Sequence, residues 1–195
     1  MISAVVLASG NDHTTGEQKL FEQFRGKPVL QWVLENALAS ELDEIVCVTR
    51  EFESARQHID LIDERLFWLK NYVADRGKST SVIAGLWAAN PKSDGVMFLF
   101  GDQPFIRKEL INLLIERFEH KSAWIIAPIF NEKPRNPVLF RRELFPELLQ
   151  LTGDRDGRAL LEKHGEKTAL VEWQDEVPFL DLDVREDYER IKKLD

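Results

Sequence analysis

The chain has 195 residues, of which 44% are hydrophobic and 31% charged, and its formal net charge is −8. This balance is typical of one soluble globular domain, and the acidic excess argues against general nucleic-acid binding, because clustered Lys and Arg supply most of the affinity for a phosphate backbone. No apolar run approaches the roughly 18 residues of a membrane span, and the amino terminus lacks a signal-peptide layout. We therefore expect one cytoplasmic domain over residues 1–195, with its single cysteine, Cys47, as a buried and inert thiol.

Short apolar runs alternate with helical patterns along the chain. The expected strands are Ile2–Leu7, Ile45–Val48, Leu66–Leu69, Val96–Phe100 and Ala123–Ile126. Helices are expected after Pro28, near Ser79, from Arg107 to Glu119 and from Arg185 to Lys193. This alternation predicts an α/β fold with three layers, in which a mainly parallel sheet carries helices on both faces.

The helix expected near Ser79 has an apolar pattern that directs Val82, Ile83, Leu86 and Trp87 inward. The five tryptophans fall mostly in such periodic segments, which favours core packing over base stacking. The stretch from residue 130 to residue 161 breaks the alternation with prolines and glycines. A substrate-side lobe and a surface excursion without a role are equally compatible with that stretch.

A polar loop follows the first strand. After Val5–Ala8 come Gly10, Gly16 and Lys19, so backbone N–H groups and a lysine gather at the carboxyl end of a parallel strand. Anionic ligands bind there in open α/β sheets. The spacing excludes a Walker A loop, because five residues separate the glycines and Leu20 follows the lysine; the G-x-G-x-x-G pattern is missing as well.

A second motif, Gly101-Asp102-Gln103-Pro104, ends the strand expected at residues 96–100. Asp102 could begin a magnesium site, because Mg²⁺ takes one or two protein carboxylates and completes its shell with water and phosphate oxygens. The same carboxylate could instead cap the turn or the next helix.

Taken in order, these motifs resemble the molybdenum cofactor nucleotidyltransferases (the MobA-like NTP transferase family). The similarity is strongest to their cytidylyltransferase branch and implies the nucleotide-diphospho-sugar transferase fold. In the opening loop the matching residues are Leu7, Ala8, Gly10, Gly16, Lys19 and Leu20. The later matching segments are Gly77–Val82, Gly101–Pro104, Arg135–Phe140, Leu151–Arg158 and Asp181–Tyr188.

The resemblance implies that a terminal phosphate of a molybdopterin-type cofactor attacks the α-phosphate of a nucleoside triphosphate, with CTP favoured and pyrophosphate released. It implies Lys19 and Asp102 as catalytic residues, and Mg²⁺ held by Asp102 and Asp183, although Asp183 also suits a helix N-cap. The implied nucleotide-binding residues are Leu7, Ala8, Ser9, Gly10, Gly16, Lys19, Gly77, Lys78, Ser79 and Ser81. The implied acceptor-binding residues are Arg135, Asn136, Pro137 and Arg158.

By the same resemblance, residues 1–105 form a nucleotide-binding half and residues 106–195 an acceptor-binding half, and a molybdenum hydroxylase or its chaperone is a possible partner. Two residues depart from the family pattern: Asp12 stands at the usual serine position and Thr14 at the usual arginine position. Both changes oppose anion binding. Arg76, Lys78 or a metal at Asp12 could compensate. A different acceptor, such as a sugar or polyol phosphate, and a catalytically weakened accessory protein remain as alternatives.

Overall fold

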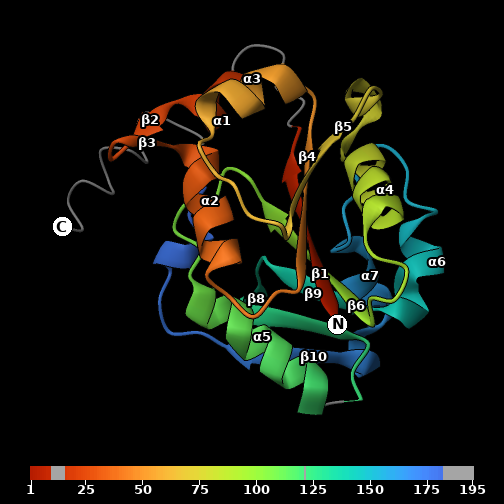
Figure 1. The fold of residues 1–195 in the computed structure, drawn as a ribbon. Helices are drawn as coiled ribbons and strands as arrows, with labels where there is room; N and C mark the ends of the chain where they lie inside the picture. Colours follow the sequence, from red (N-terminus) through yellow and green to blue (C-terminus); the bar gives the residue numbers. More distant parts are fainter. Residues whose placement is uncertain (10–15, 121, 182–195) are drawn as a thin grey trace.

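The computed structural model describes residues 1–9, 16–120 and 122–181. Its main sheet has the strand order β10-β7-β9-β6-β1-β4-β5, with β8 beside β7 (Figure 1). These strands are β1 (Ile2–Ala8), β4 (Glu44–Thr49), β5 (Leu66–Lys70), β6 (Gly95–Phe100), β7 (Ile125–Phe130), β8 (Lys133–Pro134), β9 (Val138–Arg141) and β10 (Thr168–Glu172). A separate hairpin pairs β2 (Gln23–Phe24) with β3 (Lys27–Pro28).

The sheet is mainly parallel, as the sequence predicts. β1 pairs in parallel with both β4 and β6, β4 with β5, and β7 with β10. β9 and the short β8 are the exceptions: β9 lies antiparallel between β6 and β7, and β8 pairs antiparallel with β7. The irregular stretch after residue 130 therefore supplies a buried strand in the middle of the sheet, and is not merely a surface excursion.

Helices cover both faces of the sheet (Figure 1). The α-helices are α1 (Gly16–Phe21), α2 (Val29–Leu38), α3 (Phe52–His58), α4 (Lys78–Ala88), α5 (Lys108–His120), α6 (Phe145–Leu148) and α7 (Ala159–Lys163). Four short 3₁₀ turns join them: η1 (Ala74–Arg76), η2 (Arg142–Leu144), η3 (Gly165–Lys167) and η4 (Val177–Phe179). The helix expected at residues 185–193 lies outside the described residues.

Two apolar clusters hold the three layers together. α2 and α5 bury residues such as Leu30 and Leu110 against one face of the sheet. α4 buries Val82 and Leu86 against the other face. The apolar residues of α5 at helical spacing predict one inward face, and all five of them are buried: Leu110, Ile111, Leu114, Ile115 and Phe118.

The expected inward orientation of Trp87 is wrong, because 73% of its surface is exposed. α4 instead turns Gly85 toward β1, so closely that a Cβ atom there would lie 2.3 Å from Val5 Cγ1. Trp87 follows Gly85 by two residues, a rotation of about 200° around the helix axis. The Trp87 side chain therefore points away from the sheet, into solvent. The apolar pattern concealed this orientation, because the residue nearest the sheet has no side chain.

Cys47 is fully buried in β4, as expected, and burial raises the pKa of its thiol well above the ordinary value. The other four tryptophans, Trp32, Trp68, Trp124 and Trp173, are half-buried and pack beside the apolar clusters. No helix in the described ranges combines the length and apolar character needed to cross a membrane.

Candidate active site

The ends of β1 and β6 place the first two motifs side by side. Gly101 N–H donates to Leu7 O at 3.0 Å, and a Cβ atom on Gly101 would lie 3.2 Å from Ala8 Cβ. The opening loop therefore leaves the sheet beside the turn that carries Asp102. The two strands are parallel neighbours, so their carboxyl ends share one edge of the sheet.

The start of α4 is joined to a loop from much later in the chain. Gly77 has a φ of 111°, and an added Cβ atom would lie 2.4 Å from the carbonyl carbon of Gly153. Ser79 N–H donates to Gly153 O at 3.0 Å. The side chain of Ser79 is buried, so this predicted nucleotide-binding residue links the two loops through its backbone.

A buried asparagine ties three segments of this edge together. Asn71 Nδ2 donates to Thr80 Oγ1 and Ser81 Oγ, each at 2.9 Å, and Asn71 Oδ1 accepts from Val73 N–H at 3.1 Å. Ser81 Oγ also hydrogen-bonds Ser9 Oγ at the end of β1. Sequence reasoning missed Asn71, although an asparagine directly after a predicted strand was a usable signal.

Two cationic side chains lie near the ring of Phe100, the last residue of β6. Lys78 Nζ and Arg158 Cζ each lie 5.9 Å from the centroid of the Phe100 ring. Arg158 also pairs with Asp156, its NH2 nitrogen 2.9 Å from Oδ2. The structure thus places a predicted acceptor-binding arginine and a predicted nucleotide-binding lysine near the same aromatic ring, at the strand end that leads to Asp102.

Asp102 is half-buried in the turn after β6, and its neighbour Gln103 donates from Nε2 to Asp181 Oδ1 at 2.6 Å. Within the described ranges, no group of three or more His, Cys, Asp or Glu side chains could hold a metal ion. Mg²⁺ needs no such cage, because one or two carboxylates suffice when substrate phosphates complete its coordination. Asp102 fits that pattern, while Asp183 lies outside the described residues.

The opening loop is described only in part. Lys19 lies in the last turn of α1 and Gly16 begins that helix. Gly10, Asp12 and Thr14 lie outside the described residues, so the effect of the two unusual loop residues stays a prediction.

Arg135, one of the predicted acceptor-binding residues, lies near the carboxyl end of β7. Arg135 N–H donates to Pro128 O at 2.8 Å on one side of β7, and Trp173 N–H donates to Ile129 O at 3.1 Å on the other. Arg135 Nε and Trp173 Nε1 are both buried, and neither has a hydrogen-bond partner among the described residues. Unpaired buried N–H groups are uncommon, so an acceptor group from a ligand or water would be favoured there.

The two residues between Arg135 and β9 are less accessible than the resemblance suggests. Asn136 is 8% exposed and Pro137 is also buried. Of the predicted acceptor-binding set, only Arg135 and Arg158 therefore keep substantial exposed surface.

The family model of the MobA-like NTP transferase domain matches residues 4–168. The chain belongs to the MobA-like NTP transferase family. The chain is 28% identical to purine catabolism protein PucB of Bacillus subtilis, and the alignment covers 97% of this chain and 95% of PucB. A probable molybdenum cofactor guanylyltransferase of Aquifex aeolicus is 25% identical, over 97% and 90% of the two chains.

Solved structures show the same fold. Rv0371c from Mycobacterium tuberculosis superposes with a TM-score of 0.84 at 23% identity, covering 99% of this chain and 98% of that one. Its complex with manganese gives a TM-score of 0.79 at 24% identity, with 98% of each chain covered. The MobA-like chain is thus a nucleotidyltransferase with the nucleotide-diphospho-sugar transferase fold.

Proposed function

We propose that this nucleotidyltransferase transfers a nucleotide from a nucleoside triphosphate to a molybdopterin-type cofactor, with release of pyrophosphate. The observation that supports the proposal is that Lys78 and Arg158 both lie near the Phe100 ring, two residues before Asp102 in the chain. One residue of each proposed half thereby lies where a nucleotide and an anionic acceptor would have to meet. The relatives named as molybdenum cofactor guanylyltransferases supply the acceptor class.

The chemistry needs charge neutralisation and alignment, without a nucleophile from the protein. Loop N–H groups and Lys19 hold the triphosphate, and Lys78 and Arg158 offset the negative charge that the acceptor adds. Mg²⁺ at Asp102 would polarise the α-phosphate and balance the charge of the leaving pyrophosphate. The manganese complex of Rv0371c supports a divalent ion.

We propose CTP as the nucleotide, because the Gly101-Asp102-Gln103-Pro104 turn resembles the cytidylyltransferase branch. The relatives named as guanylyltransferases support GTP instead. The test offers the protein equal amounts of CTP and GTP. The mass of the cofactor product then shows which nucleotide was transferred. A product that carries guanine would overturn the CTP proposal and leave the proposed transfer intact.

The transfer itself is tested with purified protein, Mg²⁺, each of the four common nucleoside triphosphates and molybdopterin-type cofactor, following pyrophosphate. We expect release that depends on both the metal and the cofactor. Release with sugar or polyol phosphates, and none with the cofactor, would identify a different acceptor. No release with any nucleotide or acceptor would contradict the proposal.

The accessory alternative has its own observation, the Asp12 and Thr14 substitutions in the opening loop. Thr14→Arg separates the two cases. An enzyme with a weakened loop should gain turnover when the guanidinium is restored, whereas an accessory protein should bind nucleotide tightly without turnover before and after the change. We further propose that the enzyme acts in the cytoplasm, in keeping with its single buried thiol, and that its product passes to a molybdenum hydroxylase or the chaperone of one.

A further inference from the structure

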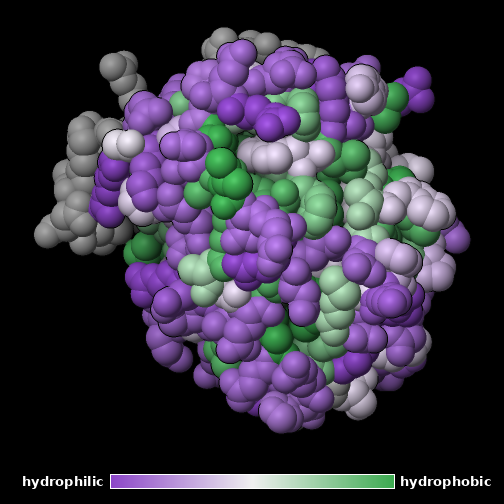
Figure 2. Space-filling model, viewed as in Figure 1, coloured by the Kyte–Doolittle hydropathy of each residue, from purple (hydrophilic) through white to green (hydrophobic). Residues whose placement is uncertain are grey.

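The sheet has one long apolar edge that no other strand of the described residues covers. β5 is the last strand in the sheet order and pairs only with β4. Its sequence, Leu66-Phe67-Trp68-Leu69, is apolar, and Phe67 is 51% exposed. In Figure 2, hydrophobic residues gather over the part of the surface where Figure 1 places β5.

The backbone of β5 offers a defined pairing pattern. Ile45 N–H donates to Arg65 O, and Asn71 N–H donates to Thr49 O, so the odd-numbered residues direct their backbone groups toward β4. Because successive residues alternate, the backbone groups of Trp68 and Lys70 point away from the sheet. Leu66 N–H is already taken by Asp63 O, at 3.1 Å.

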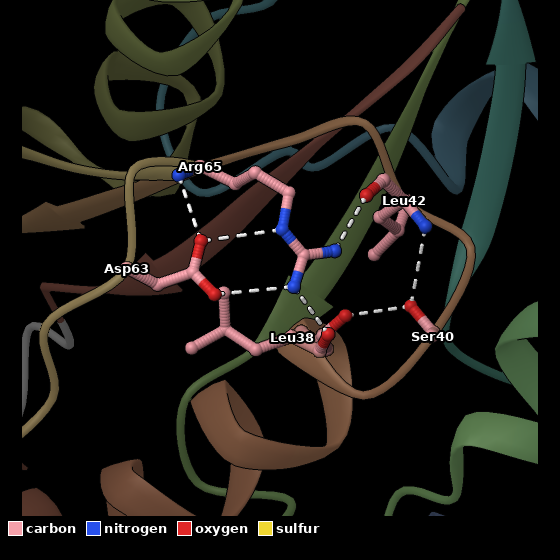
Figure 3. A network of polar contacts seen from close by, with 6 residues as sticks. Leu38, Ser40, Leu42, Asp63 and Arg65 are labelled. Atoms are coloured by element: carbon pink, nitrogen blue, oxygen red, sulfur yellow. Dashed lines mark hydrogen bonds and ion pairs between the residues drawn. The ribbon is translucent and has the colours of Figure 1, made fainter.

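The start of β5 is held rigidly. Arg65 donates to Leu38 O at 2.7 Å and to Leu42 O at 3.3 Å, and it also binds Asp63 (Figure 3). These contacts fix the strand's entry to the end of α2 and to the loop before β4. An edge that is already ordered loses little conformational entropy when it pairs, which favours association.

We propose that two copies of this chain pair in antiparallel fashion along β5, so that their sheets become continuous across a two-fold axis near Phe67. Lys70 of each copy then faces the turn just before β5 of the other, which carries Glu64, and both side chains are exposed. Apolar residues of the two copies meet between these charged pairs. Opposite charges and aromatic pairs across strands are each stabilising.

The opposite edge of the sheet shows why a second copy should select β5. β10 carries an exposed Leu170, Glu172 ends the strand, and Glu166 precedes it in η3; both glutamates are exposed, while the Lys167 amine lies over the Trp124 ring. Antiparallel self-pairing of β10 would bring these acidic ends toward each other. Like charges across strands are destabilising, and charged edges are a recognised barrier to pairing.

Sedimentation velocity of the full chain over a wide concentration range tests the proposal. We expect a dimer that dissociates on dilution. Phe67→Lys should produce a monomer, because it places two cations near the axis and removes apolar contact. The matched change on the other edge, Leu170→Lys, should leave the dimer intact, and circular dichroism should show that both variants are folded.

A charge exchange gives a second test. Lys70→Glu should weaken the dimer because it faces Glu64, and the double variant Glu64→Lys with Lys70→Glu should restore it. A monomeric wild type, a dimer that survives Phe67→Lys, or a failure of the double variant to restore association would each overturn the proposal.

Discussion

The proposed nucleotide side and the proposed acceptor side of the site differ in how their polar groups are satisfied. On the nucleotide side, Asn71, Thr80, Ser81 and Ser9 hydrogen-bond one another, so the loop ends are held before any ligand arrives. On the acceptor side, two buried N–H groups flank the end of β7 without a partner. The comparison indicates a preorganised nucleotide site beside an acceptor site that is completed by what binds to it.

Removal of the charged residues that serve both sides should have the largest effect. Asp102→Ala and Lys19→Ala should each lower metal-dependent turnover by at least about 10²–10³-fold, the usual loss for a missing transition-state contact. The turnover is measured as the rate of pyrophosphate release at saturating substrate concentrations. Asp60→Ala, at an exposed position outside the predicted site residues, is the control. Wild-type rates in both active-site variants would remove this site from consideration.

Gly77→Ala should damage the nucleotide side next most severely. The added Cβ atom would lie 2.4 Å from Gly153 backbone, and the φ of 111° is unfavourable for alanine. Such backbone strain costs about 1–3 kcal/mol, so the free energy of unfolding should fall and the KM for nucleotide should rise. Gly165→Ala is the matched control, because nothing lies within 4 Å of its added Cβ atom. Equal unfolding midpoints for the two variants would contradict the prediction.

Asn71→Ala tests whether the hydrogen-bonded network orients the nucleotide site. It leaves the hydroxyls of Thr80 and Ser81 without their common donor, and each lost hydrogen bond costs about 1 kcal/mol. We expect the KM for nucleotide to rise about tenfold, with little change in kcat and in the KM for acceptor. Asn36→Ala removes only a contact to Trp32 O within α2 and serves as the control. A change confined to kcat would indicate a different role.

Trp173→Phe should have the smallest effect on stability and tests the acceptor side. It removes an N–H that makes no hydrogen bond, so the free energy of unfolding should stay constant or rise slightly. The KM for acceptor should rise severalfold if this N–H meets the acceptor. Trp32→Phe removes a hydrogen bond that is made, to Phe24 O at 2.9 Å, and should cost about 1 kcal/mol. If Trp173→Phe and Trp32→Phe lowered the free energy of unfolding equally, the proposed difference between the two sides would be wrong.

Sequence reasoning succeeded where local pattern and strand order carry the information. The apolar run of β1 and the periodic face of α5 identified their elements, and motif order led to the family. It failed at α4, where Gly85 rather than Trp87 faces the sheet. It also left open the stretch after residue 130, because a short strand such as β9 is recognisable only when its neighbours β6 and β7 are in place.

The sequence by itself determined the α/β alternation, the buried Cys47 and the two motifs at the ends of β1 and β6, because each depends on residues close together in the chain. Only the tertiary structure decided that Gly77 packs on Gly153, that Lys78 and Arg158 share the Phe100 ring, and that Asn71 holds the start of α4. These contacts join segments from different strands and loops. Their distances depend on how the sheet and helices pack, which no local pattern specifies.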